Sequence, residues 1–200
     1  MCFLKEENDL RTFVAIDVGE KVVNQVDSVG EKLRKMGFKA NWVSGKNTHI
    51  TLEFLGDMET ETVKSVASMI SKRLRGFPSF TLKTTKLGYF KKKNLPRVIW
   101  IGLEQSDLLT QLFRETKIAL EGLGFKIDGR FHPHITIGRM KYSPPYWMKL
   151  LKTISIEEVV FPVEEVIVYK SILTPKGAIY EKQYSCDFEG GLIDHELKKG

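Results

Sequence analysis

The sequence contains the tripeptide His-Ile-Thr twice, once in each half of the chain. The first copy is His49 to Thr51 in "NTHITLEFLG", and the second is His134 to Thr136 in "FHPHITIGRM". An imidazole can take or give a proton near neutral pH, and a threonine hydroxyl can hydrogen-bond a phosphate oxygen. The whole chain has four histidines, so two that share the same following residues form a specific signal.

The spacing within each tripeptide places the imidazole and the hydroxyl together. Side chains alternate between the faces of a β-strand, so His49 and Thr51 share one face, and His134 and Thr136 do the same. Two such strands facing each other across a groove would surround one small anion. A neutral histidine could accept a proton from attacking water while a charged one protonates the leaving oxygen, and the hydroxyls could hold the phosphate. This predicts in-line phosphoester cleavage that needs no metal.

A metal site and a structural role are the alternatives for these histidines. His132 and His134 lie two residues apart and could bind zinc with His49 as a third ligand, as in a metallohydrolase. However, Asn47 stands where a partner histidine would repeat the pattern in the first copy, and no matching Asp or Glu accompanies either motif. We therefore favour a structural role for His132, beside Pro133. Hydrogen-bonded core histidines would be the purely structural alternative.

The surrounding sequence predicts the elements that would position these residues. Alternating apolar and β-branched residues predict strands at 11–17, 39–43, 48–56, 80–90, 97–103, 131–140, 163–173 and 178–188. Helical spacing predicts helices at 20–37, after a cap at Asp57, at 106–123 and, started by proline, at 144–153. The order predicts an α+β fold forming one domain over residues 1–200, with its core at about 11–188. The glycine-rich, charged tail 189–200 is expected to be flexible.

Composition sets broad limits on partners and location. A net charge of +6 and a pI near 9.2 favour an anionic partner such as nucleic acid. There is no run of eighteen apolar residues and no signal-peptide pattern, so we expect a cytoplasmic protein without a membrane partner. Cys2 and Cys186 lie near opposite ends and form no CxxC, which argues against a disulfide framework or a zinc finger. Without coiled-coil heptads, we expect a monomer.

The two motifs, together with "RTFVAID" near the start, resemble those of the 2H phosphoesterase superfamily. Within it, the chain is most similar to the RNA 2′,3′-cyclic phosphodiesterases, historically called LigT-like 2′-5′ RNA ligases. Supporting stretches are "NWV" before the first motif, "RVIWIGL" before the third helix and "YKSILTPKGAIYEKQYS" near the end. The resemblance covers about Arg11 to Phe188.

This resemblance implies a bilobal fold of two mainly antiparallel sheets with outer helices and a central groove. It implies hydrolysis of RNA 2′,3′-cyclic phosphate ends, or of cyclic nucleotides, to a 2′-phosphate and a 3′-hydroxyl without a cofactor, with reversible 2′-5′ RNA joining in some members. His49 would be the proton donor and His134 the acceptor, although the roles could be exchanged, and Thr51 and Thr136 would hold the phosphate. A module that binds RNA or a nucleotide without turnover is the alternative.

Further residues could grip the substrate. The resemblance points to Arg139 for a contact with the phosphate or the base, and to Phe13 and Phe54 near the groove, where aromatic rings could stack on a base. Arg139 has the opposite strand parity to His134, so we expect it to reach the groove only if the strand bends or ends there. Lys91 to Lys93 could attract RNA phosphates if their loop overhangs the groove. The remaining stacking candidates are Trp42, Tyr142, Tyr146 and Trp147.

Overall fold

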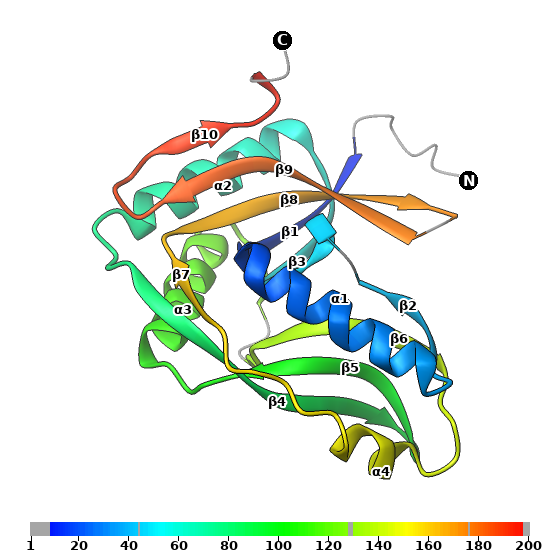
Figure 1. Cartoon of the computed structure of the whole chain (residues 1–200). Coiled ribbons are helices and arrows are strands. Elements are labelled where there is room, and N and C mark those ends of the chain that lie inside the picture. Colours follow the sequence, from blue (N-terminus) through cyan, green and yellow to red (C-terminus); the bar gives the residue numbers. More distant parts are fainter. Residues whose placement is uncertain (1–8, 44, 128–129, 176, 198–200) are drawn as a thin grey trace, which may run out of the picture.

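The computed structural model describes residues 9–43, 45–127, 130–175 and 177–197, so Cys2 lies outside the described residues. Ten strands alternate with four α-helices and one short 3-10 helix, η1 (Figure 1). In chain order the elements are β1 (Asp9–Asp17), α1 (Gly19–Lys35), β2 (Lys39–Trp42), η1 (Gly45–Asn47), β3 (His49–Glu59), α2 (Thr60–Leu74), β4 (Phe80–Lys92), β5 (Leu95–Leu103), α3 (Asp107–Glu121), β6 (His134–Tyr142), α4 (Trp147–Lys152), β7 (Val160–Val163), β8 (Glu165–Thr174), β9 (Gly177–Asp187) and β10 (Leu192–Asp194).

The strands form one antiparallel sheet in the order β10-β9-β8-β1-β3-β6-β5-β4-β7, and β2 pairs with β6. The predicted α+β class is confirmed, whereas the strands are joined in one sheet instead of the two we expected. The join is narrow, because the register between β3 and β6 consists of the single pair Ile50 and Ile135. This seam divides the sheet into a first half, β10 to β3, and a second half, β6 to β7, which lie above and below each other in Figure 1.

The helices cover one face of this sheet and leave the histidines on the other. α1 packs on β6, and α2 packs on strands of the first half and on α3. Ile50 and Leu52 of β3, and Ile135 and Ile137 of β6, are buried in the helix-covered core. Burying these aliphatic side chains fixes the register of each strand, since a one-residue slip would turn them to the other face. The opposite face of the sheet, which carries the histidines and threonines of the two motifs, is called the site face below.

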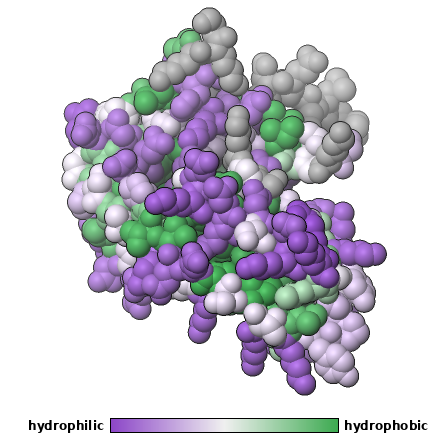
Figure 2. Space-filling view, viewed as in Figure 1, coloured by the Kyte–Doolittle hydropathy of each residue, from purple (hydrophilic) through white to green (hydrophobic). Residues whose placement is uncertain are grey.

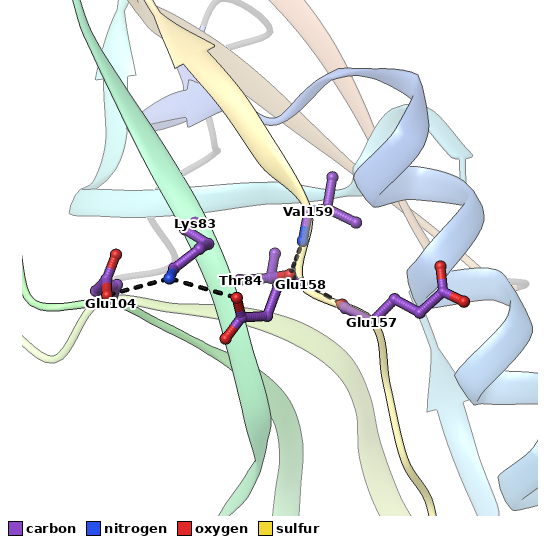
Figure 3. A network of polar contacts seen from close by, with 6 residues as sticks. All are labelled: Lys83, Thr84, Glu104, Glu157, Glu158 and Val159. Atoms are coloured by element: carbon purple, nitrogen blue, oxygen red, sulfur yellow. Dashed lines mark hydrogen bonds and ion pairs between the residues drawn. The ribbon is translucent and has the colours of Figure 1, made fainter.

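A polar network secures the segment that leads into β7 against β4 (Figure 3). The buried Thr84 hydroxyl accepts a hydrogen bond from the Val159 amide at 2.9 Å, and Lys83 bridges the carboxylates of Glu104 and Glu158 at 3.2 and 3.3 Å. β7 is the edge strand of the second half and, within the described residues, pairs only with β4. These side-chain bonds therefore add to the single strand ladder that holds this segment.

Several local predictions differ from the structure. Asp57 lies within β3 and does not cap α2, whose N-cap is Glu59. Pro145 does not start α4, because Tyr146 is the N-cap, in the left-handed conformation. In the tail we expected to be flexible, residues 192–194 form β10, paired with β9. Residues 198–200 lie outside the described residues.

The predicted basic loop is a tight turn. Lys91 and Lys92 belong to β4, and a turn at Lys93 and Asn94 leads directly into β5. Cys186 is a buried free cysteine, and burial raises the pKa of its thiol.

Hydrophilic side chains cover most of the face shown in Figure 2, and its outline is indented at the right, between the two halves. In the part of the chain that the structure describes, no helix combines the length and apolar character that crossing a membrane requires.

Candidate active site

Both His-Ile-Thr motifs line one cavity of about 220 Å³ on the site face. His49 and His134 are the first residues of β3 and β6, the two strands that meet at the seam, so the register between these strands brings the motifs together. The residues lining the cavity are Val43, Asn47, His49, Thr51, Phe54, Phe90, Val98, His134, Thr136, Arg139 and Tyr180. The cavity thus contains two imidazoles, two threonine hydroxyls and one guanidinium.

The two imidazoles are oriented in the same way by backbone carbonyls. Nδ1 of His49 lies 2.8 Å from the carbonyl oxygen of Asn47, and Nδ1 of His134 lies 2.7 Å from that of His132. Nδ1 therefore donates its proton in both rings, which leaves Nε2 as the nitrogen that can exchange a proton with a ligand. In His49, Nε2 lies 3.0 Å from the Thr51 hydroxyl, which donates to it when the ring is neutral.

Aromatic rings pack around each imidazole, and the two sets differ in number. His49 is surrounded by Phe13, Tyr169 and Tyr180, with ring centroids 5.0, 6.2 and 5.2 Å away. His134 contacts Phe90 edge-on, with centroids 5.0 Å apart. Trp100 lies next to this second pair, 6.1 Å from His134 and 5.4 Å from Phe90. This packing removes water from both rings and restricts their rotation.

Burial lowers the pKa of both histidines from the usual 6.5. For His49 the pKa falls to about 4, mainly through burial, with further lowering by the charges of His134 and Arg139. The Asn47 carbonyl and the Asp17 carboxylate act in the opposite direction. For His134 the pKa is also lowered, first by burial and then by Arg139, against the effect of the His132 carbonyl. Both imidazoles are thus biased toward the neutral form until an anion offsets the positive charges.

A β-bulge follows the threonine in each motif strand. Thr51 pairs with Ala15, but the next pair joins Glu53 to Val14, so Leu52 is an extra residue. In β6, Thr136 pairs with Trp100. The next pair joins Gly138 to Ile99, so Ile137 is the extra residue there. An extra residue reverses the alternation of the side chains that follow.

The bulges bring one more side chain from each strand onto the site face. Phe54 and Arg139, each three residues after the threonine of its motif, line the cavity although simple alternation would turn them away. The bend that we expected to be necessary for Arg139 is therefore this bulge in β6. Phe54 is 61% exposed, so its ring is available to a ligand.

Phe13 lies beside His49, but its ring is covered and does not face the cavity. It is 1% exposed, and its ring stacks on Tyr169 with centroids 5.1 Å apart, behind His49. Its predicted stacking on a substrate does not fit this position, because the rings of His49, Tyr169 and Tyr180 cover it. The remaining aromatic candidates, Trp42, Tyr142, Tyr146 and Trp147, are not among the residues that line the cavity.

The structure adds residues that the sequence did not reveal. The side-chain amide of Asn47 donates to the Ala178 carbonyl at 2.6 Å and accepts from the Tyr180 amide at 3.1 Å, which fixes β9 beside the motif and sets Tyr180 at the cavity. Phe90 forms the wall beside His134. Neither contact has a local sequence signature, because each joins segments far apart in the chain.

The three-histidine metal site is not brought together in this cavity. The side chain of His132 is exposed and is not part of the lining, and its carbonyl instead orients His134. Across residues 9–197, as far as they are described, no group of three or more His, Cys, Asp or Glu side chains could hold a metal ion.

Comparison with known proteins places this site in a family. The profile of the LigT like Phosphoesterase family matches residues 16–100 and again residues 101–180, so each match contains one motif. The RNA 2′,3′-cyclic phosphodiesterase of Thermotoga maritima is 46% identical over 184 residues, which are 92% of this chain and 98% of that protein. The protein of the same name from Archaeoglobus fulgidus is 34% identical over 174 residues, which cover 86% and 97%.

Solved structures agree with the sequence matches. The protein TT0787 of Thermus thermophilus matches with a TM-score of 0.74 and 26% identity, over 90% of this chain and 99% of that one. Escherichia coli LigT in its apo form matches with a TM-score of 0.67 and 26% identity, over 90% and 97%. These matches extend over nearly the whole chain and contain both motifs, so the protein belongs to the LigT-like phosphoesterase family.

Proposed function

We propose that this protein hydrolyses the 2′,3′-cyclic phosphate ends of RNA to a 2′-phosphate and a 3′-hydroxyl. The observation that carries the proposal is that two His-Thr pairs from different strands line one cavity, with the Nδ1 of each imidazole bound to a backbone carbonyl. The relatives that carry the name RNA 2′,3′-cyclic phosphodiesterase support the choice of substrate. One chain supplies both pairs, which supports action as a monomer.

In the proposed reaction, water attacks the phosphorus while the bond to the 3′ oxygen breaks. His134 accepts the proton of the water through Nε2, and His49 gives a proton to the departing 3′ oxygen. The Asp17 carboxylate acts toward the charged form of His49, although it is the smallest of the influences on that pKa, and no carboxylate acts in this way on His134 among the described residues. The donor form of His49 arises when the bound phosphate offsets the nearby positive charges.

The other residues of the cavity have matching roles. Thr51 and Thr136 donate hydrogen bonds to the non-bridging phosphate oxygens, which requires the Thr51 hydroxyl to leave Nε2 of His49 when the substrate enters. Arg139 pairs with the phosphate charge, and exposed Phe54 stacks on the terminal base.

The same site could also join RNA ends. If the 5′-hydroxyl of a second RNA takes the place of water, attack on the cyclic phosphate forms a 2′-5′ phosphodiester and again releases the 3′-hydroxyl. The proton transfers of the two histidines are unchanged in this reaction. We propose this joining as a secondary activity of the site.

The test uses an RNA oligonucleotide that ends in a 2′,3′-cyclic phosphate. We expect its conversion to a 2′-phosphate product, with equal rates with and without a chelator. His49→Ala and His134→Ala should each lower kcat by roughly 10²–10⁴-fold, the range for losing a general acid or base. Product position can be read by phosphorus NMR, and circular dichroism of the variants checks their folding.

The alternatives predict other results. A module that only binds RNA would bind the oligonucleotide without converting it. A metallohydrolase would lose activity with the chelator and regain it on adding zinc. A 3′-phosphate product would contradict the proposed acid and base positions.

A further inference from the structure

Positive charge is concentrated at one end of the sheet, beyond His134. The segments 39–42, 90–98 and 134–146 meet at this end and contain Lys39, Lys91, Lys92, Lys93, Arg97, Arg139 and Lys141 but no Asp or Glu. These seven cations exceed the net charge of +6 of the whole chain, so the rest of the protein is close to neutral. Among the described residues, none of the seven forms an ion pair. Their charge therefore remains available to a partner.

Part of this charge lies directly beyond the catalytic cavity. Arg139 lines the cavity, and Met140 after it is buried, so Lys141 returns to the site face. On β4, Phe90 lines the cavity and Lys92, two residues on, faces the same way, whereas Lys91 turns back over the Tyr89 ring. The cations thus continue the line of the cavity along both strands.

These side chains border a second hollow of about 210 Å³. Its lining includes Lys92, Lys93, Arg97 and Lys141, which are called the cationic track below. Arg139 stands between the catalytic cavity and the track. With a rise of about 3.4 Å per residue, the distance along β6 from His134 to Lys141 is roughly 24 Å, enough for several nucleotides of extended RNA.

The opposite end of the site face has a different character. A larger hollow of about 910 Å³ beyond His49 is bordered by Asp17, Glu20 and Glu181. Lys182, which also borders this hollow, is bound to Asp17 at 2.7 Å. The end that contains the seven cations is therefore the more favourable direction for the polynucleotide backbone.

We propose that the cationic track binds the RNA backbone upstream of the cyclic phosphate, which makes polynucleotide ends better substrates than cyclic mononucleotides. This inference rests on the proposed function. The terminal phosphate lies between the two histidines, its base lies against Phe54, and the preceding phosphates pass Arg139 and reach Lys141 and Lys92. A cyclic mononucleotide fills the cavity but does not reach the track.

The experiment measures the activity of a double variant of the track, and of a control double variant, on two substrates. We expect Lys92→Gln/Lys141→Gln to lower kcat/KM for a ten-nucleotide RNA with a 2′,3′-cyclic phosphate by roughly tenfold at low salt, because two phosphate contacts are lost. Its kcat/KM for 2′,3′-cyclic AMP should remain within about twofold of the wild type. The slope of log kcat/KM against log salt for the RNA should become shallower by about 1.4, which is about 0.7 for each contact with single-stranded RNA.

A matched control removes the same charge elsewhere. Lys64 and Lys72 are exposed on α2, on the helix-covered side of the sheet, and Lys64→Gln/Lys72→Gln should leave both substrates and the salt slope unchanged. Thermal unfolding of both double variants checks their folding.

Three results would contradict the proposal that the cationic track binds RNA. They are an equal loss of kcat/KM for RNA and 2′,3′-cyclic AMP, an unchanged rate with RNA, or a wild type that prefers the mononucleotide. Failure of the proposed function is separate, because the wild type would then convert neither substrate. Binding of a fluorescent RNA ending in a 3′-phosphate would still test the track, with weaker binding expected for Lys92→Gln/Lys141→Gln than for the control, and equal binding counting against it.

Discussion

The two motif strands, β3 and β6, use the same backbone device to present different chemistry. Each begins with a histidine held by the carbonyl two residues earlier, and each has a bulge directly after the threonine. The side chain that the bulge turns onto the site face is the apolar Phe54 in β3 and the cationic Arg139 in β6. The histidine–threonine pair proposed for acid–base catalysis is thus duplicated, while the residue three positions after each threonine distinguishes the two halves.

Removing each of these two side chains in turn is the most direct way to test the comparison. Arg139→Gln should lower kcat/KM for an RNA cyclic phosphate by about 100-fold, because it leaves the phosphate without a charge-assisted partner. Phe54→Ala should lower it by about tenfold, through weaker stacking on the base.

The substrate separates the two effects further. The loss for Phe54→Ala should diminish with a terminal abasic ribose, whereas the loss for Arg139→Gln should persist. Steady-state kinetics with both substrates measures this. Equal losses of kcat/KM for the two variants on both substrates would contradict the proposal that Phe54 contacts the base and Arg139 the phosphate.

The second difference between the halves is how strongly burial acts on the two imidazoles. Because the pKa of His49 is about 4 in the folded protein and near 6.5 when unfolded, the unfolded chain binds an extra proton between these values. The free energy of unfolding therefore falls as the pH drops through this range. His49 alone should account for about 2 kcal/mol of lost stability at pH 5 relative to pH 8.

Urea unfolding at both pH values checks this for variants of each half. His49→Gln should lose about 2 kcal/mol less than the wild type between pH 8 and pH 5, because its side chain does not titrate. His134→Gln provides the comparison, since the pKa of His134 is lowered in the same direction. A pH dependence identical to that of the wild type in His49→Gln would contradict the shifted pKa.

The third and smallest test concerns the packing behind His134. A Cβ at Gly88 would lie 2.1 Å from the Trp100 ring, which packs on Phe90 and His134. Gly88→Ala should therefore displace Trp100 and lower kcat by a few-fold through misplacement of His134.

Gly30→Ala is the matched control, because a Cβ there meets atoms only at 3.7 Å or beyond, in ordinary contact. Gly30 lies inside α1, so this change should stabilise the protein by about 0.5–1 kcal/mol and leave kcat unchanged. A Gly88→Ala variant with full kcat would show that Trp100 does not position His134.

The sequence alone was sufficient to predict those site residues whose orientation depends only on the alternation of side chains along a strand. His49 with Thr51, and His134 with Thr136, occupy common faces because aliphatic residues between and after them are buried on the other side. Arg139 could not be placed, because a bulge adds one residue to one strand and leaves no mark in the alternation of residue types.

Long-range packing accounts for the remaining differences. Phe13 has the expected strand position, but rings from β8 and β9 cover it, and no local pattern shows which strands will be neighbours. Asn47 was considered only as a missing histidine, whereas both ends of its amide hold β9. In the same way, β10 forms because the backbone of β9 offers a free edge to a short segment of the tail.

The seam between the halves has a mechanical consequence. Ile50 and Ile135 form the one ladder pair between β3 and β6 in the described chain, and each of these isoleucines directly follows a catalytic histidine candidate. Bending the sheet at this pair disturbs few hydrogen bonds, yet it changes the separation of the imidazoles directly. The seam is therefore the place where any rotation of one half against the other would act most directly on the distance between the two imidazoles.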